Sequence, residues 1–275
     1  MTPFRASPGL TDDWKHFGFD VTEGVATLTF SRPEKLNALT FDVYADVRDL
    51  LAELPERGDV KALVLTGTGR GFCSGGDVNL IIGELLGMGT KELLEFTRMT
   101  GTVVRRMREC PLPVIAAVNG VAAGAGAVLA LAADFRLLAR SASFTFLFTK
   151  VGLSGADMGS AYLLPRLIGL GRATELLMLG ETVDSTRALD IGLATEVHDD
   201  DELAGAAGAL ARRFAAGPAL AYGTTKVLLS RELDIDLGAA VELETATQAL
   251  LMTTEDHAEF YAAFTGKREP RWKGR

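Results

Sequence analysis

Several short segments of the chain show the hydrophobic patterns of β-strands. Over residues 24–30, apolar and polar positions alternate, which is typical of a strand with one buried face. Residues 60–65, 114–118 and 135–138 are instead apolar at nearly every position, which predicts strands buried on both faces. Strands of this second kind favour a layered α/β architecture.

Helical spacing of apolar positions follows these strands. The first such segment, residues 39–54, ends before Pro55, and a helix of small residues is predicted after the strand at 114–118. After Val197 the strand patterns cease. Helices are predicted there over about residues 202–216, 219–229, 237–251 and 254–264. We therefore expect an α/β core over residues 1–200 and a helical C-terminal region over residues 201–275.

Composition and charge narrow the class of protein. Of the 275 residues, 48% are hydrophobic and 23% are charged, as in ordinary globular proteins. A net charge of −8 argues against nucleic acid or an anionic membrane as the main partner, because both attract basic surfaces. Two cysteines and three scattered histidines predict neither a disulfide framework nor a metal site. Residues 1–20 lack an apolar signal core, and glycines interrupt the apolar stretch 114–135, so we expect a cytoplasmic protein without a membrane span.

Two glycine-rich turns carry the clearest chemical signal. One spans residues 71–77 (GFCSGGD) and the other spans residues 119–126 (NGVAAGAG). Glycine lets the backbone approach a ligand closely, and a helix that starts at such a turn presents unpaired N–H groups at its positive end. Two of these ends side by side would stabilise a developing oxyanion. The structural alternative is a pair of tight turns that allow close helix packing.

The motifs along the chain resemble those of the crotonase superfamily, which includes enoyl-CoA hydratases and isomerases. The resemblance covers roughly residues 20–272, and the motifs fall in the family's order. They are RPEKLNAL at 32–39, GFCSGGD at 71–77, VNGVAAGAG at 118–126, GL at 152–153, DMG at 157–159, LPRLIG at 164–169, GL at 192–193 and FTGKREPRW at 264–272. This resemblance implies a spiral of ββα units with a helical C-terminal oligomerisation region, and an acyl-CoA thioester as substrate.

The same resemblance implies where the thioester binds. Its carbonyl oxygen is expected between the backbone N–H groups of Gly76 and Ala125, which would stabilise an enolate-like intermediate. The adenine of coenzyme A is expected near the Ser74 carbonyl and the stretch from Leu36 to Ala38. Coenzyme A enters as part of the substrate, and no separate cofactor is expected.

The family's assembly implies a further contribution from a neighbouring subunit. The chain is expected to form a homotrimer or a dimer of trimers. The C-terminal helix of a neighbour would then close the nucleotide end of the site, with Phe264 and Lys267 as its contact residues.

The acid and base of the reaction depart from the hydratase pattern. The positions of the two hydratase glutamates hold Val128 and Phe148, and neither side chain can transfer a proton. Asp157 instead falls where dienoyl-CoA isomerases, epoxyphenylacetyl-CoA isomerases and chlorobenzoyl-CoA dehalogenases have an aspartate. Its apolar surroundings predict a raised carboxyl pKa. The alternative role for Asp157 is to cap a helix that starts near Ser160.

Other polar residues near the motifs have simpler interpretations. We expect Cys73 to be an inert buried thiol, because no histidine lies near it in sequence. Asp77 is predicted to cap a helix, and Asp134 to form a structural ion pair. Glu84 is a lesser acid candidate, since residues 80–89 resemble the family's variable substrate-facing segment.

Three functions are compatible with this set of residues. The first is double-bond isomerisation, in which Asp157 takes a proton from one carbon and returns it to another. The second is an enoyl-CoA hydratase with non-standard acid and base residues, or another outcome such as thioester hydrolysis or halide displacement. The third is a protein that binds coenzyme A thioesters and has lost catalysis. We favour the first because a single base suffices for it.

Overall fold

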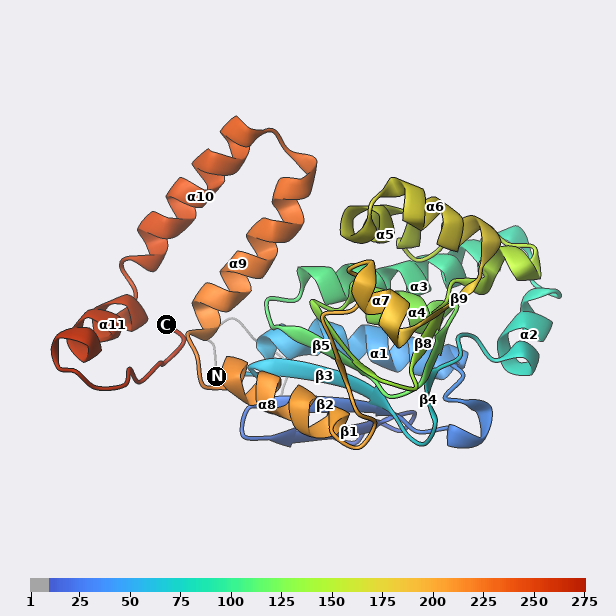
Figure 1. Ribbon diagram of the computed structural model, residues 1–275, viewed down its shortest axis with the longest axis horizontal. Helices are drawn as coiled ribbons and strands as arrows, with labels where there is room; N and C mark the ends of the chain where they lie inside the picture. The colour runs from blue at the N-terminus through green and yellow to red at the C-terminus, as the bar shows by residue number, and fades with distance from the viewer. Residues whose placement is uncertain (1–9) are drawn as a thin grey trace.

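The computed structural model describes residues 10–275, so the first nine residues of the predicted core lie outside it. The strands form two sheets (Figure 1). The large sheet has the order β1 (Gly18–Thr22), β2 (Val25–Phe30), β3 (Ala62–Gly67), β5 (Val114–Val118), β7 (Phe135–Ala139) and β10 (Glu196–His198). The small sheet has the order β4 (Gly71–Cys73), β6 (Val121–Ala123), β8 (Ser143–Thr145) and β9 (Thr182–Asp184).

From β3 to β8, consecutive strands alternate between the two sheets. β3, β5 and β7 are parallel neighbours in the large sheet, and β4, β6 and β8, which follow them in turn, are parallel neighbours in the small one. A helix comes after each pair: α3 (Thr90–Glu109), α4 (Ala125–Ala132) and α5 (Ser160–Ile168). This arrangement confirms the predicted α/β spiral of ββα units.

The edge of the large sheet contains a strand that the sequence pattern did not predict. β1 pairs with β2 in antiparallel register, and the two are joined at Glu23 and Gly24, which both have left-handed φ angles of 52° and 79°. In β2 the alternating side chains of Ala26, Leu28 and Phe30 are buried, as expected. β1 lacks so clear a pattern because no residue in it is fully buried.

The helices on one side of the core include the longest in the chain. α1 (Phe41–Glu53) begins after Thr40, whose hydroxyl accepts the Val43 N–H, two residues later than the pattern predicted. It packs against α3, which the sequence interpretation missed. Phe96 in the first half of α3 contacts Phe41 and Tyr44, and Val103, Val104 and Met107 in its second half are buried. α6 (Leu170–Leu179) and α7 (Ser185–Asp190) were also not predicted.

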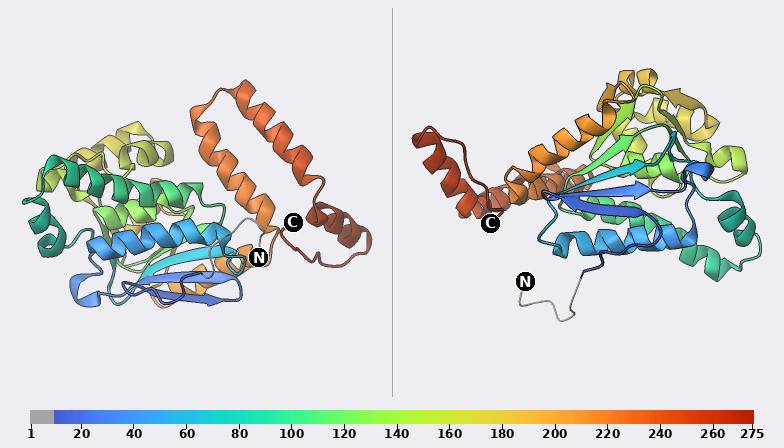
Figure 2. Two further views of the ribbon diagram at one scale, coloured as in Figure 1. Left: turned by 180° about the vertical axis from the view of Figure 1, so that it is seen from behind. Right: turned by 90° about the horizontal axis from the view of Figure 1, so that it is seen from below.

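All four predicted C-terminal helices are present. α8 (Leu203–Ala215) packs on the large sheet, whereas α9 (Ala219–Arg231), α10 (Leu237–Leu251) and α11 (Glu255–Thr265) extend away from the core as an arm (Figures 1 and 2). No side chain of α10 is buried. The last strand ends at His198, close to the predicted division of the chain at residues 200 and 201, which itself stays a prediction.

The apolar stretch at residues 114–135 lies in the middle of the core. It forms β5, β6 and α4, and every residue of α4 is buried. Among residues 10–275, no helix is both long and apolar enough to cross a membrane.

Candidate active site

The two glycine loops meet at one edge of the small sheet. β4 and β6 are parallel neighbours, so their carboxyl ends, where the loops begin, lie side by side. A Cβ atom added to Gly75 would lie 3.0 Å from the carbonyl oxygen of Ala123 and 3.4 Å from the backbone nitrogen of Ala125. Gly75 also has a φ of 95°, so the contact requires glycine on both steric and conformational grounds.

Each loop presents a backbone N–H group without a partner in the fold. Leu39 pairs with the first loop by donating to the Gly75 carbonyl (2.8 Å) and accepting from the Asp77 N–H (2.9 Å). The intervening Gly76 N–H has no acceptor among residues 10–275. Ala125 is the first residue of α4, where N–H groups lack an intrahelical acceptor. Both groups are available to a ligand, and their binding of a thioester oxygen stays a prediction.

Asp157 does not cap a helix. α5 begins after Gly159, which has a left-handed φ of 89°, and no side chain accepts from the first turn of α5. The Asp157 carboxylate accepts one hydrogen bond, from the Met158 N–H to Oδ1 (2.9 Å). The Ser160 hydroxyl ties this segment together by accepting from the Asp157 N–H (3.1 Å) and donating to the Gly155 carbonyl (2.7 Å). The capping interpretation is therefore wrong, and Oδ2 has no hydrogen-bond donor within the described chain.

The pKa of the Asp157 carboxyl group is shifted upward, as expected. Partial burial raises the pKa of its carboxyl group, and the hydrogen bond from Met158 opposes this only in part. Burial, and then negative charge at Cys73 and at Asp157, raises the pKa of the Tyr44 phenol. Tyr44 of α1 therefore lies within electrostatic reach of both the first loop and Asp157. α5 also packs against α4, whose first residue is Ala125.

The two positions of the hydratase glutamates lie in the apolar core. Val128 of α4 is fully buried, and Phe148 is 7% exposed. Leu147 beside it approaches the second loop, since a Cβ atom on Gly124 would lie 3.9 Å from its side chain. Glu84, in the short helix α2 (Gly83–Leu85), is exposed to solvent. Of the acid candidates Asp157 and Glu84, Asp157 is the half-buried carboxylate, and its charge acts on Tyr44 together with that of Cys73 in the first loop.

The residues predicted for the adenine end lie together. The Ser74 N–H donates to the Leu36 carbonyl (2.9 Å), and its hydroxyl donates to the Lys35 carbonyl (3.1 Å). Leu36 is half-buried and Ala38 is buried. Their contact with a nucleotide stays a prediction.

Asn37 is a structural residue of the site that the sequence interpretation missed. Its buried side-chain amide donates to the carbonyl groups of Thr68 (2.9 Å) and Gly71 (2.7 Å), so it fixes the segment of residues 36–38 against the start of the first loop. Asn37 and Leu36 both have left-handed φ angles, 58° and 49°, which are uncommon outside glycine. Asparagine adopts this conformation more readily than most residues, which was the available signal.

Phe264 and Lys267 do not reach this site in the same chain. They lie at the end of α11, at the opposite end of the molecule from α2 and β4 (Figures 1 and 2). Phe264 is 73% exposed.

The simpler interpretations of three residues are confirmed. The Asp77 carboxylate accepts the N–H groups of Asn79 and Leu80 and caps the π-helical turn Val78–Ile82. Asp134 forms buried ion pairs. Burial raises the pKa of the Cys73 thiol to about 12, which makes it unreactive. In the described part of the chain, no three His, Cys, Asp or Glu side chains form a group that could hold a metal ion.

Comparisons with known proteins agree with this architecture. The family model described as enoyl-CoA hydratase/isomerase matches residues 20–275. The 1,2-epoxyphenylacetyl-CoA isomerase of Escherichia coli K12 is 38% identical over 255 residues, which cover 93% of this chain and 97% of that protein. The short-chain-enoyl-CoA hydratase of Clostridium acetobutylicum is 31% identical over 89% of this chain and 92% of that one. A crystal structure from Streptomyces coelicolor A3(2), provisionally assigned as an enoyl-CoA hydratase, is 64% identical, with a TM-score of 0.98 over 100% of both chains.

Proposed function

The chain belongs to the enoyl-CoA hydratase/isomerase, or crotonase, family of enzymes, and we propose that it isomerises the double bond of an enoyl-CoA thioester with Asp157 as acid and base. Enzymes of this family act on acyl-CoA thioesters. The observation that carries the proposal is the state of Asp157. It is a half-buried carboxylate with one hydrogen bond, no capping role and a raised pKa, and its charge acts on Tyr44 together with that of Cys73 in the first glycine loop.

In the proposed reaction, Asp157 transfers the proton and the two glycine loops stabilise the negative charge that forms. Asp157 removes a proton from a carbon of the bound acyl group, and the resulting negative charge spreads onto the thioester oxygen. The N–H groups of Gly76 and Ala125 stabilise that oxygen more strongly than they stabilise the neutral carbonyl. Asp157 then returns the proton to a different carbon, and the double bond has moved. No water is consumed, so no second proton-transfer group is required.

Coenzyme A takes part in this proposal only as a portion of the substrate. Its adenine would lie against Ser74 and the stretch from Leu36 to Ala38, where the hydrogen bonds of Ser74 and Asn37 hold the backbone in place. The acyl group would then extend past the two loops towards Asp157. We propose no separate cofactor.

Hydration is the second candidate function, because the clostridial relative is named as a hydratase. The two reactions differ in whether oxygen from water enters the product. Turnover of 2-enoyl-CoA and 3-enoyl-CoA substrates in ¹⁸O-labelled water, followed by mass spectrometry, separates them. Isomerisation gives a product of unchanged mass with a shifted double bond, whereas hydration adds one labelled oxygen. Addition of label as the main outcome would overturn the isomerase proposal.

We further propose that the chain assembles as a trimer or a dimer of trimers through its C-terminal arm. α10 buries no side chain within its own chain, and Leu237, Leu250 and Phe264 are largely exposed along the arm. An exposed apolar surface of this kind is stabilised when a second copy covers it. Assembly would also let Phe264 and Lys267 of one subunit approach the site of another. Sedimentation that gives a stable monomer at micromolar concentration would contradict this assembly.

A further inference from the structure

A cavity lies between the core and the arm, and no residue of the two glycine loops lines it. It has a volume of about 580 Å³, which is within the range of small-molecule sites. Its walls come from the ends of α3 and α4, from β7, and from α5, α8 and α9. Gly76, Ala125 and Asp157 are not among its lining residues.

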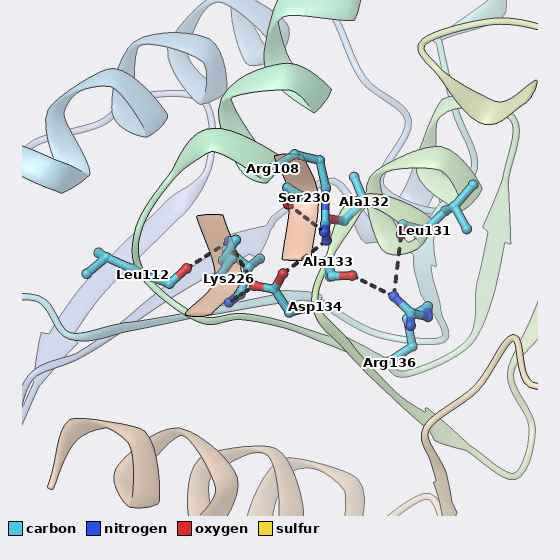
Figure 3. Close-up of polar contacts among 10 residues, drawn as sticks. Arg108, Leu112, Leu131, Ala132, Ala133, Asp134, Arg136, Lys226 and Ser230 are labelled. Carbon is cyan, nitrogen blue, oxygen red and sulfur yellow. Dashed lines mark hydrogen bonds and ion pairs between the residues drawn. The ribbon is translucent and has the colours of Figure 1, made fainter. Parts of the chain in front are cut away.

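Three cations lie near a single carboxylate in the lining of the cavity (Figure 3). Arg108, Arg136 and Lys226 line it together with a single carboxylate, Asp134, so two positive charges remain uncompensated. Asp134 is already engaged, because it pairs with Arg108 (3.0 Å) and with Lys226 (2.8 Å) and accepts the Val114 N–H. Arg166 also lines the cavity but pairs with Asp234 (3.3 Å).

Arg136 is the cation that lacks a direct counter-charge. It is 6% exposed, and its contacts are the backbone carbonyls of Leu193 (2.7 Å), Ala133 (2.5 Å) and Leu131 (3.4 Å). Its Nη2 has no acceptor among residues 10–275. The pKa of Arg136 is lowered to about 10, mainly by burial; the negative charge of Asp134 opposes this shift and the positive charge of Arg108 adds to it. A buried arginine with a free donor and a cationic neighbour is stabilised by an anion.

Most of the remaining lining is apolar. It includes Leu163 and Leu167 of α5, Leu229 of α9, the adjacent Leu233, and Phe214 of α8. Leu229 is 63% exposed within its own chain.

We propose that this cavity binds a small amphipathic anion, an apolar monocarboxylate whose head group lies against Arg136 and whose chain lies between α5 and α9. The charged end and the apolar walls each match one part of such a molecule. Because the cavity and the glycine loops have separate linings, the site would operate independently of the proposed isomerase reaction.

Calorimetric titration of the full-length, assembled protein with decanoate tests the proposal. We expect decanoate to bind, decan-1-ol to bind at least about tenfold more weakly, and high salt to weaken the decanoate complex. Saturating acyl-CoA should leave the affinity for decanoate unchanged. Absence of decanoate binding, equal binding of the neutral alcohol, or displacement of decanoate by acyl-CoA would each overturn the proposal.

Two matched variants locate the binding. Replacement of Arg136 risks misfolding, so we choose Leu229→Glu, which places a negative charge at the exposed apolar wall. It should weaken decanoate binding about tenfold by like-charge repulsion and the loss of apolar contact. Leu189→Glu introduces the same substitution at a partly exposed leucine of α7 outside the cavity lining. It should change the affinity for decanoate less than about twofold. Equal effects of the two variants would contradict the assignment. If wild-type protein does not bind decanoate while Leu229→Glu dissociates the assembly, the cavity is a subunit interface and the proposal fails.

Discussion

The backbone nitrogen of Ala125 lies 3.4 Å from where a Cβ atom of residue 75 would stand, and residue 75 is glycine. This contact joins the loop after β4 to the start of α4, although 50 residues separate them along the chain. It sets the relative positions of the N–H groups of Gly76 and Ala125. The proposed oxyanion site therefore depends on a glycine that would donate no hydrogen bond to the substrate itself.

Replacement of Gly75 tests whether the proposed oxyanion site depends on it. In Gly75→Ala the added methyl group would press on the Ala123 carbonyl and on Ala125, and alanine is strained at a φ of 95°. We expect a loss of roughly 10²-fold in kcat, as when an oxyanion donor is displaced, and a destabilisation of about 1–2 kcal/mol. Kinetics and chemical denaturation measure the two effects.

Gly205→Ala is the matched control for this variant. Gly205 lies within α8, and a Cβ atom there would have no neighbour within 4 Å. The substitution should leave kcat unchanged and stabilise the protein by about 0.5–1 kcal/mol. A Gly75→Ala enzyme with normal turnover would show that the loop contact is not needed for catalysis.

The ion pairs of Asp134 should contribute to stability. In Asp134→Ala, Arg108 and Lys226 lose their shared carboxylate while Lys226 remains 7% exposed. Removal of one partner from a buried pair typically costs about 3–5 kcal/mol. Asp199→Ala removes an ion pair with Arg140 in which both side chains are more than half exposed. Its loss should lower the free energy of unfolding by about 1 kcal/mol or less. Urea denaturation that gives similar losses for the two variants would contradict this account.

Lys267 should act on substrate binding rather than on the chemical step. If the arm of one subunit brings Lys267 near the phosphates of coenzyme A bound to another, Lys267→Ala removes an attraction present equally in ground and transition states. We expect KM to rise several-fold with little change in kcat, and added salt to reduce the difference. Lys15→Ala, at another exposed lysine, serves as the control. A fall in kcat at constant KM would contradict the assignment of Lys267 to substrate binding.

Much of the spiral was readable from the sequence because its strands are buried on both faces. Residues 114–118 form β5 with the predicted bounds, and every one of them is buried. α3 was missed although its apolar residues, from Phe96 through Met99 and Val103 to Met107, recur at helical spacing. The short strands of the small sheet have three residues each, too few for a pattern to emerge.

The candidate site was predictable in its motifs but not in its geometry. Local sequence allowed Asp157 to be either a cap or an acid. The backbone excludes the cap, because α5 begins after the left-handed turn at Met158 and Gly159 and no side chain caps it, whereas the acid role stays a prediction. Asn37 was missed because its partners, Thr68 and Gly71, lie more than 30 residues away in sequence. Long-range contacts of this kind leave no local signal.

Asp157 should link activity and stability to pH in opposite directions. As a base it must be ionised, so kcat should fall as pH drops through a carboxyl pKa that burial has raised above the usual aspartate range. A carboxyl group with a raised pKa in the folded state destabilises the fold when it ionises, so this penalty appears as pH rises through that value. Asp157→Asn should therefore melt at a higher temperature than wild type at neutral pH, and this difference should vanish below about pH 4. A lower melting temperature at neutral pH would contradict the desolvated setting.

In the proposed reaction, Asp157 moves protons at a carbon next to a thioester whose oxygen the two loops stabilise. The most direct measurement is the exchange of those protons with deuterated water in an acyl-CoA substrate, followed by mass spectrometry. Wild-type enzyme should catalyse the exchange. Asp157→Asn keeps the size of the side chain and its hydrogen bond from Met158 but removes its basicity, so the rate should fall about 10²–10⁴-fold with the fold intact. Exchange at the wild-type rate in Asp157→Asn would contradict the account.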